Sequence, residues 1–120
     1  PIFTPGVANF DLSEANGLST ENLYINRARS RSNIGLGDEA LGDLDKAQEL
    51  HDGGDTIWHE RAKVLVTLGR LEQAVEAYSE AIRANPEHAI YYEERSIIYQ
   101  DLGSINESTK DRETFERLQK

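Results

Sequence analysis

Histidine and carboxylate side chains are the groups in this sequence that could carry out chemistry. The chain contains three histidines, His51, His59 and His88. None follows another at the four-residue helical spacing with which two imidazoles bind zinc. His59-Glu60 therefore has no second histidine on its helix face, and we expect no metal site. The chain has no cysteine, which removes thiolate catalysis, disulfides and zinc–thiolate sites.

Acidic residues at helical spacing offer paired carboxylates, but general acid–base catalysis would also need a pocket to shift their pKa values. We interpret these rows as solvated helix faces. The sequence has neither a Gly-x-Gly-x-x-Gly motif nor a Walker-type Gly-Lys-Ser/Thr. We therefore expect no catalysis and no cofactor. The rows are Asp43, Asp45 and Glu49, and Glu72, Glu76 and Glu80.

The elements that must position these groups repeat at a period of 34 residues. Tyr24, Trp58 and Tyr92 are separated by that interval. Repetition at a fixed interval is the signature of one stacked supersecondary unit, in which neighbours bury each other's apolar sides. Two sets of mostly small residues share the period: Ala40, Ala74 and Ser108, and Ala47, Ala81 and Phe115.

Each unit has the pattern of a helical hairpin, with two apolar-periodic segments of about 12 residues joined by a short turn. In the second unit Trp58, Ala62 and Leu65 recur at four- and three-residue spacing, which places them on one helix face. Pro86 cannot lie inside a helix and marks a boundary. The units are expected at residues 21–54, 55–88 and 89–120, with turn glycines at Gly35, Gly69 and Gly103.

The second unit resembles the tetratricopeptide repeat, a 34-residue helix–turn–helix. The resemblance implies an all-α fold, a right-handed superhelical stack of three antiparallel helical hairpins (an α-solenoid). The first unit departs by having Asp52 where proline is usual, and the third by Ser108, Arg112 and Phe115. The matching residues of the second unit are Trp58, Leu68-Gly69, Ala74, Tyr78, Ala81 and Pro86.

Arginine and aspartate also keep phase with the repeat. Each first helix carries one arginine, and the second helices of the first and third units carry one aspartate. An arginine facing an aspartate across a hairpin would form a charge-assisted pair with a structural role. The residues are Arg27, Arg61 and Arg95, and Asp43 and Asp111.

Residues 1–20 lie outside the repeat and form a partly apolar N-terminal extension. We expect this arm either to dock on the first repeat or to insert into a neighbouring molecule. Homo-oligomerisation through the arm or through uncapped ends of the stack is therefore an alternative function, with weak self-association as its sign. The chain begins at Pro1, and both a complete protein and an excised domain are compatible with that start.

The resemblance implies a concave groove, lined by the first helices, that holds a peptide or a partner helix. We therefore expect a non-catalytic interaction module, a scaffold, adaptor or assembly factor; a distant alternative is a non-catalytic domain of a larger enzyme. Basic residues at one end and acidic residues at the other favour a partner whose basic segment lies toward the third unit. The groove candidates are Asn22, Asn26, Arg29, Asn33, His59, Lys63, Glu93, Glu94, Ile97 and Asp101.

One branch of the family uses this groove to clamp the C-terminal carboxylate of heat-shock chaperones. It needs lysine, asparagine and arginine at five groove positions, and all five differ here, two of them by carrying an acid. We therefore predict no chaperone carboxylate clamp. The five positions are Ile25, Arg29, Glu60, Ile90 and Glu94.

The net charge of −9 argues against nucleic acid or an anionic membrane as the main partner, because both need a basic surface. No apolar run approaches the roughly 20 residues of a membrane-spanning helix, and residues 1–20 lack the pattern of a signal peptide. A cysteine-free chain tolerates any redox environment. The cytoplasm is favoured, with the periplasm and an organelle lumen as alternatives.

Overall fold

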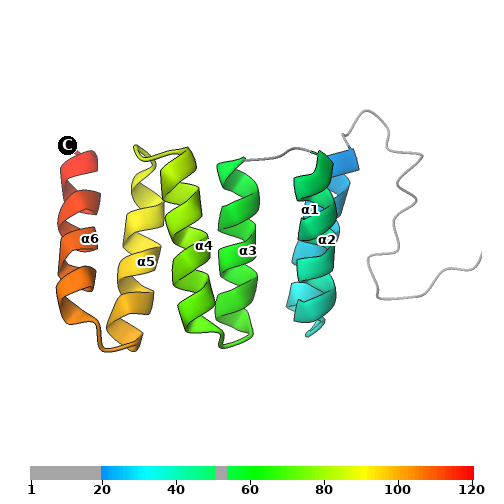
Figure 1. Ribbon diagram of the computed structural model, residues 1–120, viewed down its shortest axis with the longest axis horizontal. Helices are drawn as coiled ribbons and strands as arrows, with labels where there is room; N and C mark the ends of the chain where they lie inside the picture. The colour runs from blue at the N-terminus through cyan, green and yellow to red at the C-terminus, as the bar shows by residue number, and fades with distance from the viewer. Residues whose placement is uncertain (1–19, 51–53) are drawn as a thin grey trace, which may run out of the picture. The chain divides into compact units, whose positions relative to one another are not determined.

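The computed structural model describes residues 20–50 and 54–120. These residues form six α-helices joined by short connections, with no strand in either range (Figure 1). The all-α prediction is confirmed. The N-terminal arm, apart from Thr20, and His51 lie outside the described residues. The helices are α1 (Thr20–Asn33), α2 (Gly37–Leu50), α3 (Asp55–Thr67), α4 (Leu71–Ala84), α5 (Ala89–Asp101) and α6 (Ile105–Leu118).

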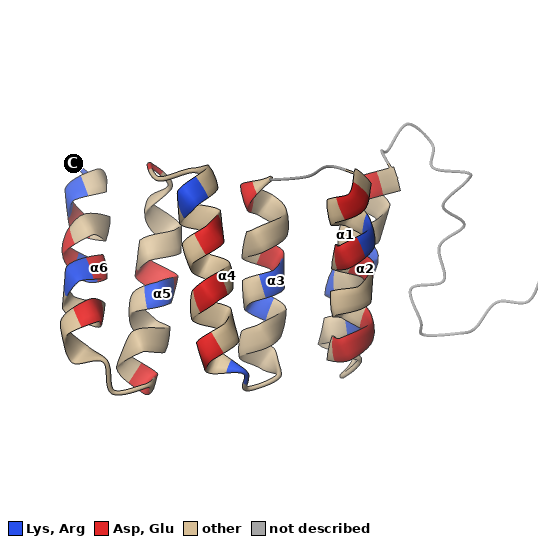
Figure 2. Ribbon diagram, viewed as in Figure 1, with Lys and Arg blue, Asp and Glu red and all other residues tan. Residues whose placement is uncertain are grey.

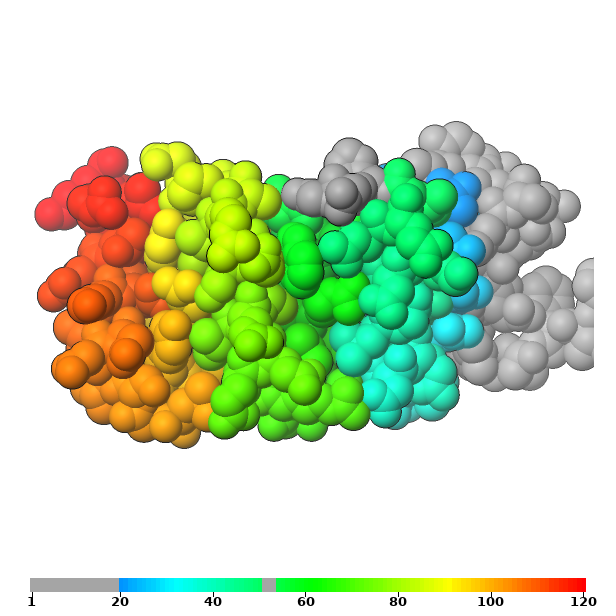
Figure 3. All heavy atoms as spheres, in the orientation of Figure 1, coloured from blue at the N-terminus to red at the C-terminus, as the bar shows by residue number. Residues whose placement is uncertain are grey.

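The chain divides into two compact units, Pro1–Gly53 and Gly54–Lys120. The first contains the α1–α2 hairpin. The second contains the α3–α4 and α5–α6 hairpins, which meet where α4 packs against α5. Side chains fill the space between the helix ribbons of this second unit (Figure 3).

The three hairpin turns share one construction. A glycine in the left-handed region follows each first helix, with φ of 87° at Gly35, 76° at Gly69 and 82° at Gly103. Only glycine adopts this conformation without a steric cost from Cβ. The next residue closes the turn on the helix before it, as where the Arg70 N–H donates to the Leu65 carbonyl at 2.9 Å. The predicted turn role of these glycines is confirmed.

Small side chains allow the two helices of a hairpin to pack closely. In the second unit Ala62 on α3 and both Ala74 and Ala81 on α4 are fully buried, and Tyr78 keeps only 3% exposure. Burying Tyr78 requires a partner for its hydroxyl, which is described below. The α1–α2 hairpin buries a comparable set, Ala28, Ala40, Leu44 and Ala47.

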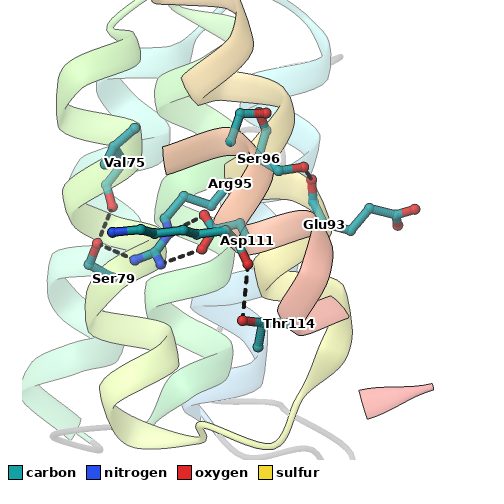
Figure 4. A network of polar contacts seen from close by, with 9 residues as sticks. Val75, Ser79, Glu93, Arg95, Ser96, Asp111 and Thr114 are labelled. Carbon is teal, nitrogen blue, oxygen red and sulfur yellow. Dashed lines mark hydrogen bonds and ion pairs between the residues drawn. The ribbon is translucent and has the colours of Figure 1, made fainter. Parts of the chain in front are cut away.

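A buried ion pair joins α5 to α6. The Nε and Nη2 atoms of Arg95 each donate to one oxygen of Asp111 at 2.7 Å, a bidentate geometry (Figure 4). Nη1 of Arg95 donates to Ser79 Oγ on α4 at 2.9 Å. Ser79 in turn donates to the Val75 carbonyl at 2.8 Å. Arg95 thus links α5 to α6 within its own hairpin and to α4 of the neighbouring hairpin.

The α1–α2 hairpin contains the corresponding pair. Arg27 Nη2 lies 2.8 Å from Asp43 Oδ1, and Arg31 Nη1 lies 3.1 Å from the same oxygen. Asp43 keeps 3% side-chain exposure, so the two arginines neutralise a carboxylate that would be costly to bury alone. The predicted Arg–Asp pairing is confirmed in both hairpins that carry the aspartate.

The periodic aromatic and arginine residues are neighbours in space. The guanidinium carbon lies 5.4 Å from the ring centroid for Arg27 and Tyr24, 5.6 Å for Arg61 and Trp58, and 6.0 Å for Arg95 and Tyr92. A guanidinium within about 6 Å of an aromatic face is attracted to its quadrupole. The two periodic patterns in the sequence therefore describe one repeated contact between residues three positions apart.

Substituting Gly69 by alanine tests the turn construction. Gly69→Ala is expected to destabilise the second unit by about 1 kcal/mol, because Cβ approaches the following carbonyl in the left-handed region. The matched control is Gly42→Ala inside α2, where an added Cβ meets nothing within 4 Å. That change should stabilise its helix by about 0.5–1 kcal/mol. Urea unfolding followed by circular dichroism measures both, and effects of the same sign would contradict the assignment.

Removing Asp111 tests the buried ion pair. Asp111→Ala leaves Arg95 partly buried without its counter-ion and should lower the free energy of unfolding by about 3 kcal/mol. Removing one partner of a buried ion pair costs about 3–5 kcal/mol. The lower value is expected here because the Arg95 side chain keeps 18% exposure. Glu113→Ala, on the exposed side of the same helix, should change the stability by less than about 0.5 kcal/mol. A similar loss in both variants would refute the structural role of the pair.

Candidate functional site

The second unit presents polar side chains from two successive first helices, α3 and α5. Gly54, in an extended conformation, precedes α3, and His88, also extended, precedes α5. Six of the ten predicted groove residues belong to these helices. They are His59 and Lys63 on α3, and Glu93, Glu94, Ile97 and Asp101 on α5. We call the surface that they form the α3–α5 face.

A carboxylate of α5 is the meeting point of three helices. His59 Nε2 on α3 lies 2.7 Å from Glu94 Oε1. The hydroxyl of Tyr78 on α4 donates to the same oxygen at 3.1 Å. The side chains of His59 and Glu94 keep 18% and 32% exposure, so the contact lies at the surface of the unit. The structure therefore brings together two residues that the sequence offered only as separate groove candidates.

The ionisation of this cluster follows from its contacts. Partial burial raises the pKa of Glu94, but the hydrogen bond and charge of His59 and the hydrogen bond from Tyr78 lower it further, and the net pKa lies below its usual value. Burial, together with the Glu94 charge, raises the pKa of the Tyr78 phenol well above its usual value. Tyr78 therefore stays neutral and acts as a donor to an ionised carboxylate.

A second hydrogen-bonded group lies beside the first. The Tyr91 hydroxyl on α5 donates to Asp55 Oδ2 at 2.6 Å, and Asn85 Nδ2 donates to the same oxygen at 3.3 Å. The Tyr91 hydrogen bond is the main reason that the pKa of Asp55 is lowered. The ring of Tyr91 contacts two imidazoles, with its centroid 4.8 Å from that of His59 and 4.2 Å from that of His88.

Lys63, the basic groove candidate on α3, is paired within its own helix. Its Nζ lies 3.3 Å from Glu60 Oε2, with 45% exposure for the lysine side chain and 6% for the glutamate. Glu60 is a buried acid at one of the positions where the chaperone clamp would need a different residue. The positive charge of Lys63 is thus partly offset by a neighbouring carboxylate on the same helix.

The remaining α5 candidates point outward. The Glu93 carboxylate extends away from the Arg95–Asp111 pair (Figure 4). Ile97 keeps 49% exposure, which is high for a large apolar side chain, and Asp101 is exposed at the end of α5. Glu93, Ile97 and Asp101 follow one another at four-residue spacing, so they form one stripe along the helix.

The four candidates on α1 belong to the first unit. Asn22, Arg29 and Asn33 are exposed and Asn26 is half-buried. Arg29 Nη1 donates to Asn26 Oδ1 at 3.3 Å. The structure brings these two together on one turn of α1.

The predicted acidic row on α4 is a solvated surface. The prediction of a solvated row on α2 is wrong for Asp43, which is buried and paired with Arg27, whereas Asp45 and Glu49 are exposed. Acidic residues follow one another along α4 in Figure 2. Glu72 and Glu76 are exposed, and half-buried Glu80 pairs with Arg83 at 2.6 Å. Within residues 20–50 and 54–120, no group of three or more histidine or acidic residues could hold a metal ion. No helix in that part of the chain is long and apolar enough to cross a membrane.

Sequence reasoning did not identify three residues of this face as site residues: Asp55, Tyr78 and Tyr91. Tyr78 had been named only as a residue that matches the repeat motif. A signal was available in the spacing, because His59 and Glu94 are 35 residues apart and Asp55 and Tyr91 are 36 apart. In a 34-residue repeat, polar residues displaced by one or two positions from the period come from successive hairpins and can meet.

Comparisons with known proteins place this architecture. A family model described as "TPR repeat" matches residues 62–103. No curated protein sequence matches the chain. The six helices of the described residues fit three such repeats.

Several solved structures are similar in fold. MamA is 17% identical with a TM-score of 0.74, over 88% of this chain and 60% of MamA. The second TPR of Spaghetti (RPAP3), bound to the HSP90 peptide SRMEEVD, is 18% identical with a TM-score of 0.74, over 82% of this chain and 91% of that one. A tetratricopeptide repeat protein from Parabacteroides merdae ATCC 43184 is 25% identical with a TM-score of 0.74, over 85% and 40%. These likenesses confirm the predicted α-solenoid class.

The pH dependence of stability tests the Glu94 contacts. A carboxylate whose pKa is lowered by folding stabilises the protein above its unfolded pKa, and loses that contribution as the pH falls through the folded pKa. The stability difference between wild type and Glu94→Gln should therefore decline as the pH falls below about 5. Urea unfolding at a series of pH values measures it. Glu93→Gln removes the adjacent carboxylate as a control, and an identical pH profile for both variants would contradict the assignment.

Proposed function

We propose that this chain, whose residues 62–103 match the tetratricopeptide-repeat model, is a non-catalytic protein-interaction module. Its α3–α5 face is proposed to bind a peptide or partner helix that carries a basic segment. Proteins of this family are typically interaction modules. A structural neighbour, the RPAP3 repeat domain, binds a peptide. Within this class, the role is that of a scaffold, an adaptor or an assembly factor.

The observation that carries the proposal is the stripe of Glu93, Ile97 and Asp101 on α5. The two acids flank an apolar side chain that keeps 49% exposure. Arg95 lies on the same helix but is engaged with Asp111, so its charge is directed away from this stripe. A complementary partner carries a lysine or arginine on each side of an apolar residue, because opposite charges set the register and the apolar contact is desolvated between them.

Charge also argues for a partner other than an acidic chaperone tail. Buried Glu60 and half-exposed Glu94 stand at positions where a carboxylate clamp would need side chains that attract an anion. An acidic peptide would meet Glu93, Glu94 and Asp101 on the same face, and like charges in an interface disfavour association. The proposed partner is therefore basic, in contrast to the SRMEEVD peptide of the RPAP3 neighbour.

Charge reversal on the stripe tests the proposal. The probe is a fluorescent, end-capped peptide of about nine residues in which lysines flank a leucine, compared with the same peptide carrying glutamates in place of lysines. Wild type should bind the basic peptide more tightly. Glu93→Lys/Asp101→Lys should weaken its binding by at least about tenfold, because attraction becomes repulsion. Glu94 is left unchanged because its carboxylate also joins three helices.

Fluorescence anisotropy at fixed ionic strength measures the affinity. The matched control is Glu113→Lys/Glu116→Lys, which changes the net charge by the same amount at exposed positions on α6. This control should retain nearly all of the affinity. If both double variants weaken binding equally, the attraction arises from net charge and the proposed face is wrong. Equal binding of the basic and acidic peptides would also refute it.

A further inference from the structure

We propose that the His59–Glu94 contact makes the α3–α5 face pH-sensitive, so that its affinity for a basic peptide rises when His59 loses its proton. This regulation rests on the proposed function, since it concerns the same face and the same class of partner. Histidine is the side chain whose ordinary titration falls between about pH 5 and 8, and His59 occupies the point where the two hairpins of the second unit share a carboxylate.

The geometry keeps the contact in both protonation states. A carboxylate can only accept hydrogen bonds, so His59 Nε2, at 2.7 Å from Glu94 Oε1, must be the donor. Protonated imidazole donates from this atom, and so does the neutral tautomer with its hydrogen on Nε2. When His59 loses the proton on Nδ1, the charge of the His59–Glu94 pair changes from zero to −1, and the two side chains need not separate.

The groups that face His59 leave this change uncompensated. From α4 it meets Tyr78, at 6.1 Å between ring centroids, and from α5 it meets Tyr91 and Glu94. Both tyrosines stay neutral, because burial raises the pKa of each phenol well above its usual value. On its own helix the flanking charged groups are Asp55, Glu60 and Lys63. The hydrogen bond from Tyr91 lowers the pKa of Asp55, so this carboxylate stays ionised where histidine ordinarily titrates.

A basic partner would sense the change directly. One of its lysines approaches Glu93, which is adjacent to Glu94 in the chain, and protonated His59 already supplies a positive charge to Glu94. Deprotonation of His59 removes this positive charge, so the net charge of the face becomes more negative by one. The Coulomb energy between two unit charges roughly 4 Å apart in water corresponds to about a fivefold change in affinity. Binding should therefore tighten about fivefold between about pH 5.5 and pH 8.

The test measures binding of the lysine-flanked, end-capped peptide at these two pH values and constant ionic strength. The lysines of the peptide remain charged throughout, so the pH dependence belongs to the protein. His59→Gln keeps a side-chain donor for Glu94 but cannot ionise, and it should bind equally at both pH values, near the wild-type affinity at the higher pH. The matched control is His88→Gln, which removes the histidine that precedes α5 and should keep the fivefold change.

A measurement without peptide supports the binding data. The NMR signal of the Glu94 carboxyl carbon should show an inflection in the histidine range in wild type and in His88→Gln, and none in His59→Gln. A pH dependence of binding that His59→Gln retains would overturn this inference and leave the proposed function standing. If wild type binds the basic peptide at neither pH, the proposed function fails and the inference fails with it.

Discussion

The bidentate ion pair between Arg95 and Asp111 fixes how α5 is turned, and the candidate site depends on that orientation. Arg95 donates hydrogen bonds to Asp111 on α6 and to Ser79 on α4, so its side chain lies on the side of α5 that faces these helices. With Arg95 inside, helical geometry places Glu93 and Ile97 on other sides of the same turns. A carboxylate stripe can therefore face outward although an arginine lies within it in the sequence. The buried pair thus contributes specificity of orientation as well as stability.

The three hairpins reach the same packing by different polar means. The α1–α2 hairpin uses Asp43 with two arginines, and the α5–α6 hairpin uses Asp111 with one. The α3–α4 hairpin has Ala77 at the corresponding position and buries it at 3% exposure. Arg61 lies over Trp58 there, like the equivalent arginines of the other hairpins. The arginine–aromatic contact, and not the ion pair, is the polar feature common to all three hairpins of the described residues.

The proposed function and its pH sensitivity both follow from sharing polar groups between hairpins. Glu94 accepts from His59 and Tyr78, so one carboxylate links α3, α4 and α5 and still keeps a third of its side chain in solvent. Glu94 both joins neighbouring helices and faces solvent. The charge of the surface therefore depends on the contacts that Glu94 makes with His59 and Tyr78. This coupling requires neither a cavity nor a conformational change, which suits a solenoid built from rigid neighbouring hairpins.

The sequence by itself determined the helices, the turns and the paired charges inside hairpins, because each is a local or strictly periodic constraint. The roles of some residues depend only on contacts within one hairpin and not on where that hairpin packs. Examples are the turn at Gly69, the close packing at Ala74 and the arginine three residues after Trp58. Only the tertiary structure decided that His59 meets Glu94. That contact joins successive hairpins at an offset of 35 residues, and a displacement of one residue from the period turns a side chain by about 100° on a helix. Which side chains meet across two hairpins therefore depends on how one packs on the next, and no local pattern specifies it.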